Sequence, residues 1–171
     1  MVRAFLTAAV LAVGCAASWP QQSTGSLPSG WERPTDADLA GPDLVFRKER
    51  PDRYLRVTGD FDGDDLQDRA ELLINRADQV YALFVFTRAS KDPTRLAGGK
   101  LSQFEPIGIS VSPPGRTKTA CGKGYFGGEY CRKHPPYIEP QFESISYFAF
   151  ESASSLFYWD GAKFQEEAIS D

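Results

Sequence analysis

Residues 53–86 have the sequence RYLRVTGDFDGDDLQDRAELLINRADQVYALFVF, in which a short acidic segment lies between stretches rich in β-branched and aromatic residues. Such residues favour strands, and the run Val80–Phe86 has the length of a buried strand. Polar turn residues from Asn75 to Gln79 can join two of these strands as a hairpin. This part of the chain is therefore predicted to fold as strand, acidic loop, strand, turn and strand.

The rest of the chain continues the β pattern. Further strands are predicted at Ile107–Val111 and at Ile145–Phe150, and Asp160-Gly161 favours a hairpin turn between residues 156–159 and 162–164. Near the N-terminus, a helix-capping pattern that begins at Thr35 predicts one short helix. We expect a single mainly β domain, an antiparallel sheet or sandwich, over residues 31–171.

The acidic segment 60–71 is hard to explain by folding alone, because neighbouring like charges repel by about 1 kcal/mol at surface distances in water. Calcium removes this repulsion, since it takes roughly six to eight oxygen ligands. The spacing matches the calcium-loop template D-x-[DN]-x-[DN]-G-x5-E, whose ligands stand at positions one, three, five, seven, nine and twelve. The predicted ligands are, in that order, Asp60, Asp62, Asp64, the Leu66 carbonyl, Asp68 and Glu71.

One position departs from this template, because Asp65 stands where the loop requires glycine for a left-handed turn. Aspartate adopts that conformation more readily than most residues, so we expect weakened binding and not its loss. The alternative interpretation is an acidic turn between two strands that holds no ion.

The flanking residues favour strands, whereas an EF-hand needs a helix on each side of its loop. Preceded by Gly59, the segment 60–68 resembles the calcium loops of FG-GAP repeats in integrin-like propellers. A propeller is not predicted, because the loop occurs once and the chain has no internal repeats. The resemblance implies that Glu71 is optional and that the ligands are Asp60, Asp62, Asp64, the Leu66 carbonyl and Asp68.

Residues 1–14 are predicted to be a signal peptide, with a basic start and an apolar run too short to span a membrane. The run ends in Leu-Ala-Val-Gly-Cys, which resembles a bacterial lipobox and implies lipidation of Cys15. Ordinary cleavage near Ala17 or Ser18 is the alternative. Residues 15–30, rich in Gln, Ser, Pro and Gly, are expected to form a flexible, lipid-anchored tether. The protein is then periplasmic or in the outer envelope, either membrane-anchored or secreted.

The remaining cysteines, Cys121 and Cys131, form an even pair once Cys15 is assigned to the lipid or to the removed signal. Exported proteins meet oxidising conditions, so we expect a disulfide that closes the loop 121–131. A zinc site is a weaker interpretation, because the two cysteines and His134 fall short of four ligands.

The loop 121–131 interleaves glycines with aromatic residues and carries basic residues within and around it. Tyrosine and arginine dominate the hot spots of interfaces, so this loop is a candidate surface for an envelope protein or an anionic glycan. The alternative is that its glycines serve turns and its cations are solvated. The candidate partner-binding residues are Lys123, Tyr125, Phe126, Tyr130 and Arg132.

Phrases near the C-terminus, taken with the acidic and cysteine loops, resemble a group of small proteobacterial exported proteins of uncharacterised function. This resemblance implies a common fold and export, and it implies no activity. The phrases are Phe150–Ser155, Tyr158–Gly161 and Ile169–Asp171.

The net charge of −4 argues against nucleic acid as a partner. His134 is the only histidine and no serine lies in a nucleophile elbow, so we expect no enzyme. The leading hypothesis is an exported, membrane-anchored calcium-binding protein with a structural or accessory role. The alternatives are an inhibitor or immunity-type protein that binds a secreted enzyme, and a hydrolase that uses carboxylates.

Overall fold

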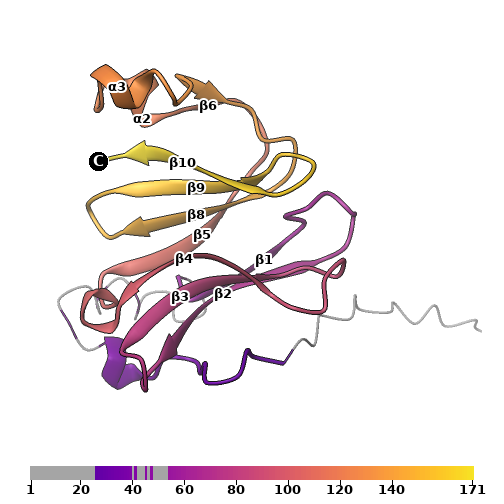
Figure 1. The fold of residues 1–171 in the computed structure, drawn as a ribbon, viewed down its shortest axis with the longest axis vertical. Coiled ribbons are helices and arrows are strands. Elements are labelled where there is room, and N and C mark those ends of the chain that lie inside the picture. Colours follow the sequence, from indigo (N-terminus) through magenta and orange to yellow (C-terminus); the bar gives the residue numbers. More distant parts are fainter. Residues whose placement is uncertain (1–25, 40, 42–44, 46, 48–53) are drawn as a thin grey trace, which may run out of the picture.

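The computed structural model describes residues 26–39, 41, 45, 47 and 54–171. The predicted signal peptide, Cys15 and most of the predicted tether lie outside these residues. The described residues form ten strands, arranged in two four-stranded antiparallel sheets and one two-stranded ribbon (Figure 1). The predicted mainly β, single-domain fold is confirmed. No helix in this described part is long and apolar enough to cross a bilayer.

The first sheet is an antiparallel meander in which each strand pairs with the next along the chain. The two central strands are buried along nearly their whole length, which agrees with the apolar sequence of β3, whereas β2 also buries Asp68, Arg69, Glu71 and Asn75. The strands are β1 (Arg56–Gly59), β2 (Asp68–Asn75), β3 (Val80–Phe86) and β4 (Thr94–Lys100).

The second sheet has the strand order β10-β9-β8-β5, and Figure 1 shows it beside the first sheet. Its strands are β5 (Ile107–Ser112), β8 (Ser144–Ala149), β9 (Ser154–Trp159) and β10 (Phe164–Ser170). The excursion between β5 and β8 contains β6 (Thr117–Lys118), α2 (Ala120–Lys123), α3 (Gly128–Cys131) and β7 (Tyr137–Ile138). It lies next to β10, the edge strand farthest from β5 (Figure 1).

The main core lies between the two sheets, because alternate residues of each strand point to the same side. Ala70, Leu72 and Ile74 of β2 belong to one buried cluster with Ile109 and Ile145 of the second sheet. Removing such apolar surface from water contributes about 25 cal/mol per Å². Two sheets that share one core make a sandwich, one of the two architectures predicted from the sequence.

The opposite face of the first sheet has a smaller apolar cluster of its own, built on Leu73, Phe84 and Phe86. Leu27 and Trp31 of the N-terminal segment pack against this cluster. The same segment pairs with β2, because Glu32 and Ile74 exchange backbone hydrogen bonds of 3.0 and 2.9 Å. Leu27, which lies within the predicted tether 15–30, is therefore packed on the domain.

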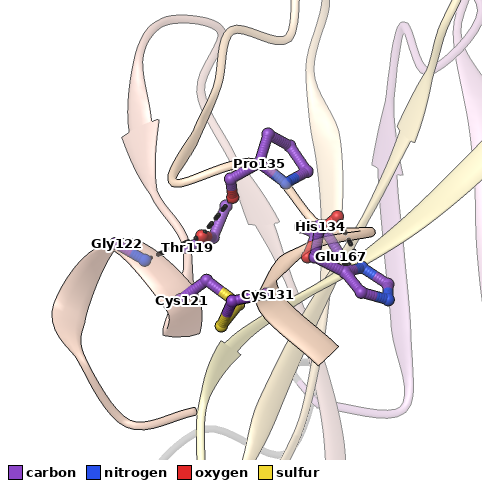
Figure 2. Close-up of a disulfide and its surroundings, with 7 residues drawn as sticks. All are labelled: Thr119, Cys121, Gly122, Cys131, His134, Pro135 and Glu167. Atoms are coloured by element: carbon purple, nitrogen blue, oxygen red, sulfur yellow. Dashed lines mark hydrogen bonds and ion pairs between the residues drawn. A yellow bond between two sulfur atoms is a disulfide. The ribbon is translucent and has the colours of Figure 1, made fainter. Parts of the chain in front are cut away.

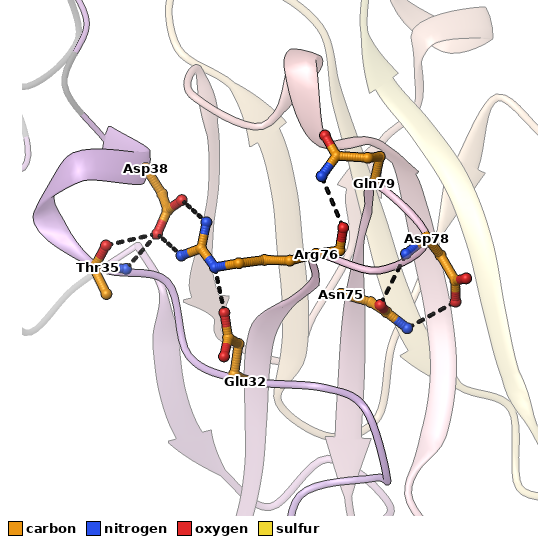
Figure 3. A network of polar contacts seen from close by, with 7 residues as sticks. All are labelled: Glu32, Thr35, Asp38, Asn75, Arg76, Asp78 and Gln79. Carbon is orange, nitrogen blue, oxygen red and sulfur yellow. Dashed lines mark hydrogen bonds and ion pairs between the residues drawn. The ribbon is translucent and has the colours of Figure 1, made fainter.

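The short helix near the N-terminus is a 3-10 helix, η1 (Asp36–Leu39). The backbone N–H and the hydroxyl of Thr35 both donate to the Asp38 carboxylate, at 2.7 and 2.8 Å, as the capping pattern predicts. Arg76 donates to Asp38 and to Glu32, so the helix is fastened to the turn after β2 (Figure 3). The hydrogen bond from Arg76 holds the pKa of Asp38 at about 2.

The predicted turn between β2 and β3 is held by its own side chains. Asn75 accepts from the Asp78 N–H at 3.1 Å and donates to the Asp78 carboxylate at 2.8 Å (Figure 3). Gln79 adopts φ 54° and its side chain donates to the Arg76 carbonyl at 2.8 Å. A second 3-10 helix, η2 (Leu101–Gln103), leads from β4 towards β5.

Candidate metal centre

The acidic loop joins β1 to β2, and its aspartates shape its backbone. Asp60 accepts from the Gly63 N–H at 2.8 Å and from the Asp65 N–H at 3.2 Å, while Asp64 accepts from the Leu66 N–H at 2.9 Å. Short side-chain-to-backbone bonds of this kind are the usual way in which aspartate stabilises turns. Asp65 has φ 61°, so it takes the left-handed conformation that the template assigns to glycine.

The three carboxylates of Asp60, Asp62 and Asp68 come together at the base of this loop. Each offers one oxygen that lies within 4.8 Å of the oxygens of the other two. Calcium binds oxygen at about 2.3–2.6 Å, so two of its ligands can stand up to roughly 5 Å apart. One calcium ion can therefore contact all three side chains.

Asp68 is the most deeply placed member of this triad and is fully buried. Its Oδ2 accepts from the N–H of Phe61, which is also fully buried, at 3.0 Å. Its Oδ1 is buried without a well-formed hydrogen bond, and the same is true of Asp62 Oδ1. The backbone of Arg88 nevertheless stabilises the charged form of Asp68, and the Thr87 side chain that of Asp62. Buried polar atoms are nearly always paired, so these carboxylates have the capacity to accept further donors or a cation.

Burial sets the electrostatics of the triad. Desolvation raises the pKa of Asp68 to about 7, and the charge of Asp62 adds to the shift. The hydrogen bond from the Phe61 N–H opposes this shift only in part. Desolvation, followed by the charge of Asp64, also raises the pKa of Asp62. A cation between these carboxylates would favour their charged forms and reverse both shifts.

The β1–β2 loop also contacts the segment that precedes β8, which is distant in sequence. Glu143, which precedes β8, accepts from the Asp60 N–H at 2.9 Å. The ring of Phe142 packs against Gly63, where a Cβ would lie 2.3 Å from the ring and φ is 79°. Sequence reasoning missed Glu143 and Phe142, because a local pattern carries no information about a partner 83 residues away.

Two predicted ligands lie outside the triad but close to it. The Asp64 carboxylate is not one of the three mutually close groups, although its charge contributes to the raised pKa values of Asp62 and Asp68. Leu66 has an exposed side chain, which is compatible with a ligand that uses only its backbone carbonyl. The roles of both residues stay predictions.

The prediction for Glu71 needs correction. Asp68 and Glu71 are three residues apart on β2, and side chains at an odd separation point to opposite faces of a strand. Glu71 Oε1 lies 3.3 Å from Arg33, 3.0 Å from Arg56 and 3.2 Å from Arg69. Position twelve of the template assumes a chain that returns to the ion, and a strand does not. Glu71 is therefore removed from the ligand set.

The second candidate site is the loop closed by the disulfide between Cys121 and Cys131, whose Cα atoms lie 5.5 Å apart. Thr119 caps α2, because its hydroxyl accepts from the Gly122 N–H at 3.2 Å and donates to the Pro135 carbonyl at 2.6 Å (Figure 2). The disulfide is the one predicted from the cysteine count, whereas the short helices α2 and α3 were not expected.

Three of the predicted partner-binding residues of this loop are exposed aromatics. The exposed fractions are 50% for Tyr125, 36% for Phe126 and 40% for Tyr130. Phe126 and Tyr130 meet edge to face at 4.9 Å. They line one side of a groove of about 410 Å³, whose other side includes Tyr147 of β8 and Ala168 of β10.

The basic residues of the loop differ in their surroundings. Arg132 is exposed, whereas Lys123 donates to the Ile169 carbonyl of β10 at 3.0 Å. His134 is stacked on Tyr130 at 4.0 Å, and its Nδ1 lies 3.0 Å from the Glu167 carboxylate (Figure 2). These contacts fasten the disulfide loop to the last strand of the second sheet.

Comparison of the chain with protein-family models, with curated proteins and with solved structures finds no match. The resemblances to FG-GAP loops and to small exported proteins therefore stay predictions. The interpretation of both candidate sites rests on the geometry described above.

Proposed function

We propose that this chain is an exported calcium-binding protein, in which one ion is held by Asp60, Asp62 and Asp68. The ion would order the β1–β2 loop, and the role of the domain would be structural or accessory and not catalytic. The observation that supports this proposal is the fully buried Asp68 carboxylate, which lies with an oxygen within 4.8 Å of oxygens of two further aspartates.

The donor set favours calcium over other common metals. It consists of oxygens alone, whereas zinc sites are usually built from cysteine and histidine. Magnesium demands a near-ideal octahedron, while calcium tolerates the irregular geometry of a flexible loop. Asp64, the Leu66 carbonyl and water would complete the coordination of an ion held by the triad.

Calorimetric titration of the metal-stripped protein with calcium tests the proposal. We expect one binding event in the native protein and at least a tenfold weaker affinity in Asp68→Asn. The matched control is Asp36→Asn, which removes the same charge at an exposed position in η1. A flat trace for the native protein, or unchanged affinity in Asp68→Asn, would contradict the proposal.

Binding to the folded state must also raise stability. At a free calcium concentration about 100 times the dissociation constant, mass action adds roughly 2.7 kcal/mol to the free energy of unfolding. Urea unfolding with and without calcium measures this gain, and magnesium in place of calcium tests selectivity. Equal gains with both ions at equal concentration would contradict the choice of calcium.

Export and lipid anchoring form a separate part of the proposal. The disulfide between Cys121 and Cys131 supports an oxidising compartment, because thiols in the cytoplasm are normally kept reduced. Mass spectrometry of the mature protein tests the anchor. A diacylated N-terminal Cys15 in the membrane fraction is the expected result, and an unmodified N-terminus near Ala17 or Ser18 would favour ordinary cleavage.

The exposed aromatics of the disulfide loop favour a second candidate function, which is inhibition of a secreted enzyme or another form of partner recognition. Phe126 lines a groove and its neighbour Tyr125 is exposed, and aromatics of this kind serve as interface anchors. Capture of a single partner from envelope extract, lost in Tyr125→Ala and kept in Tyr137→Ala, is the expected result. Tyr137 is a suitable control because it is a similarly exposed tyrosine outside the loop.

A further inference from the structure

The outer face of the first sheet gathers arginines in a chain whose net charge is −4. The strand register places four residues in one row across the sheet, with Arg56 opposite Glu71, Glu71 opposite Phe84, and Phe84 opposite Arg95. Arg33, from the N-terminal segment, reaches the same Glu71. This row lies on the face opposite to the Asp68 side chain.

The charges in this row do not balance. Arg33 and Arg56 each form an ion pair with Glu71, and within the described part of the chain neither has another carboxylate partner. One negative charge is therefore shared by two exposed guanidinium groups, and buried Arg69 approaches the same oxygen. The three distances, 3.0 to 3.3 Å, are longer than the roughly 2.7–2.9 Å of a typical charge-assisted hydrogen bond.

The cluster has two buried members, between which electrostatic interactions are strong, and two members that solvent can reach. The side chains of Glu71 and Arg69 are 2% and 6% exposed, so their surroundings screen charge poorly. The side chains of Arg33 and Arg56 are 58% and 42% exposed. Burial lowers the pKa of Arg69, and the positive charges of Arg56 and Arg33 act in the same direction.

Aromatic rings hold other guanidinium groups of this face in place. Arg69 lies over the ring of Phe86 at 4.1 Å, and Arg95 lies over Trp31 at 5.6 Å. Trp31 in turn meets Phe84 edge to face at 4.9 Å. A guanidinium fixed over a ring keeps its position, so Arg69 and Arg95 supply a fixed positive potential next to Arg33 and Arg56.

We propose that Arg33 and Arg56 bind an oxyanion, a carboxylate or phosphate group, at the mouth of the Glu71 cluster. A second negative charge there would offset part of the excess positive charge around Glu71, and the planar fork of arginine matches both kinds of oxyanion. Arg95, about 14 Å from Arg56 by three strand spacings, adds positive potential along the same row. The ligand class is a small acidic metabolite or an acidic sugar unit.

Titration of the metal-free protein at low ionic strength with inorganic phosphate, and separately with galacturonate, tests this assignment. Chemical shifts of the arginine Nε–H groups report binding at the site itself. We expect at least one probe to bind the native protein, and at least a tenfold weaker affinity in Arg56→Gln. The probe that binds more tightly distinguishes phosphate from carboxylate as the natural group.

The matched control is Arg76→Gln, because the Arg76 side chain is exposed to a similar extent, 47%, but is paired with two carboxylates, Glu32 and Asp38. It lowers the net charge by the same amount and should leave binding unchanged. Arg33→Gln is a second test variant at a more exposed position, and it serves if Arg56→Gln does not fold. Binding of neither probe, or equal losses in Arg76→Gln and the test variants, would overturn the proposal.

Discussion

Asp68 and Glu71 are two buried carboxylates on the same strand, yet their surroundings are opposite. Asp68 faces the main core beside two further aspartates, and one of its oxygens lacks a well-formed hydrogen bond. Glu71 faces outward and lies within ion-pair distance of three arginines. One carboxylate has a deficit of positive charge around it, and the other has an excess.

The difference shows how strand geometry distributes charge. A separation of three residues, which would bring two side chains together on a helix, sends them to opposite faces of a strand. The carboxylate on each face is then neutralised in a different way, by the proposed cation on one side and by arginines on the other. Four measurements test this contrast between Asp68 and Glu71.

The largest effect is expected from Glu71→Ala. Loss of this carboxylate leaves buried Arg69 beside Arg33 and Arg56 with no shared anion, and breaking a buried ion pair typically costs about 3–5 kcal/mol. Urea unfolding should show a loss of this size, in calcium and in chelator alike. A loss under about 1 kcal/mol would mean that the cluster contributes little to stability.

The substitution Asp68→Asn should stabilise the metal-free protein at pH 7, whereas Glu71→Ala destabilises it. It removes a buried charge that has no cation partner, so we expect a gain of about 1–3 kcal/mol in the free energy of unfolding. The same variant should gain less from added calcium than the native protein, because its affinity is lower. A destabilised Asp68→Asn variant in chelator would contradict the account of an unpaired charge.

The stability of the metal-free protein should depend on pH through the titration of Asp68. Folding raises the pKa of Asp68 from 3.8 to about 7, so the folded state binds this proton more tightly than the unfolded state. The stabilising contribution of Asp68 to the free energy of unfolding is therefore complete below about pH 4 and is lost as the pH rises towards 7.

Asp62 lies beside Asp68 and also has a raised pKa, so the native protein is compared with Asp68→Asn, which removes the titration of Asp68 alone. Urea midpoints from pH 4 to pH 8 should converge at the acidic end and diverge near neutrality. Calcium should reverse the trend, because it binds the deprotonated carboxylates. Parallel curves for the two proteins would contradict the raised pKa.

The smallest effect is expected from Asp65→Gly. Asp65 has φ 61°, a region that costs a non-glycine residue roughly 1 kcal/mol, so glycine should stabilise the loop by up to that amount. Calcium affinity should rise or stay level, since Asp65 is not part of the triad. A weaker affinity in calorimetry would show that the Asp65 charge assists the ion.

Local chemistry explains which features could be predicted. The strand Val80–Phe86 and the Thr35–Asp38 cap follow from residues that are neighbours in sequence. The strand β4 was missed because Thr94–Lys100 is polar and glycine-rich, with no alternation to mark it. Its pairing with β3 depends on close backbone approach, since a Cβ on Gly98 would lie 2.5 Å from the Tyr81 carbonyl oxygen.

The residues of the candidate site can likewise be divided into those that local spacing predicts and those that depend on the tertiary fold. Asp60, Asp62 and Asp68 were predicted from their spacing, and the structure brings them together. Glu71 was included because the template assumes a curved chain, and the arginines that surround it come from three separate segments. Such convergence is a property of the tertiary fold, so no short pattern in the sequence contains it.

The packing of Phe142 on Gly63, with Glu143 on the Asp60 amide, links the β1–β2 loop to the start of β8 in the other sheet. A loop tied to both halves of a sandwich cannot open without disturbing each of them. Ion occupancy should therefore slow amide hydrogen exchange in the central strands of both sheets together, and not in the loop alone. Through this link, ordering of a surface loop can make the two sheets unfold more cooperatively.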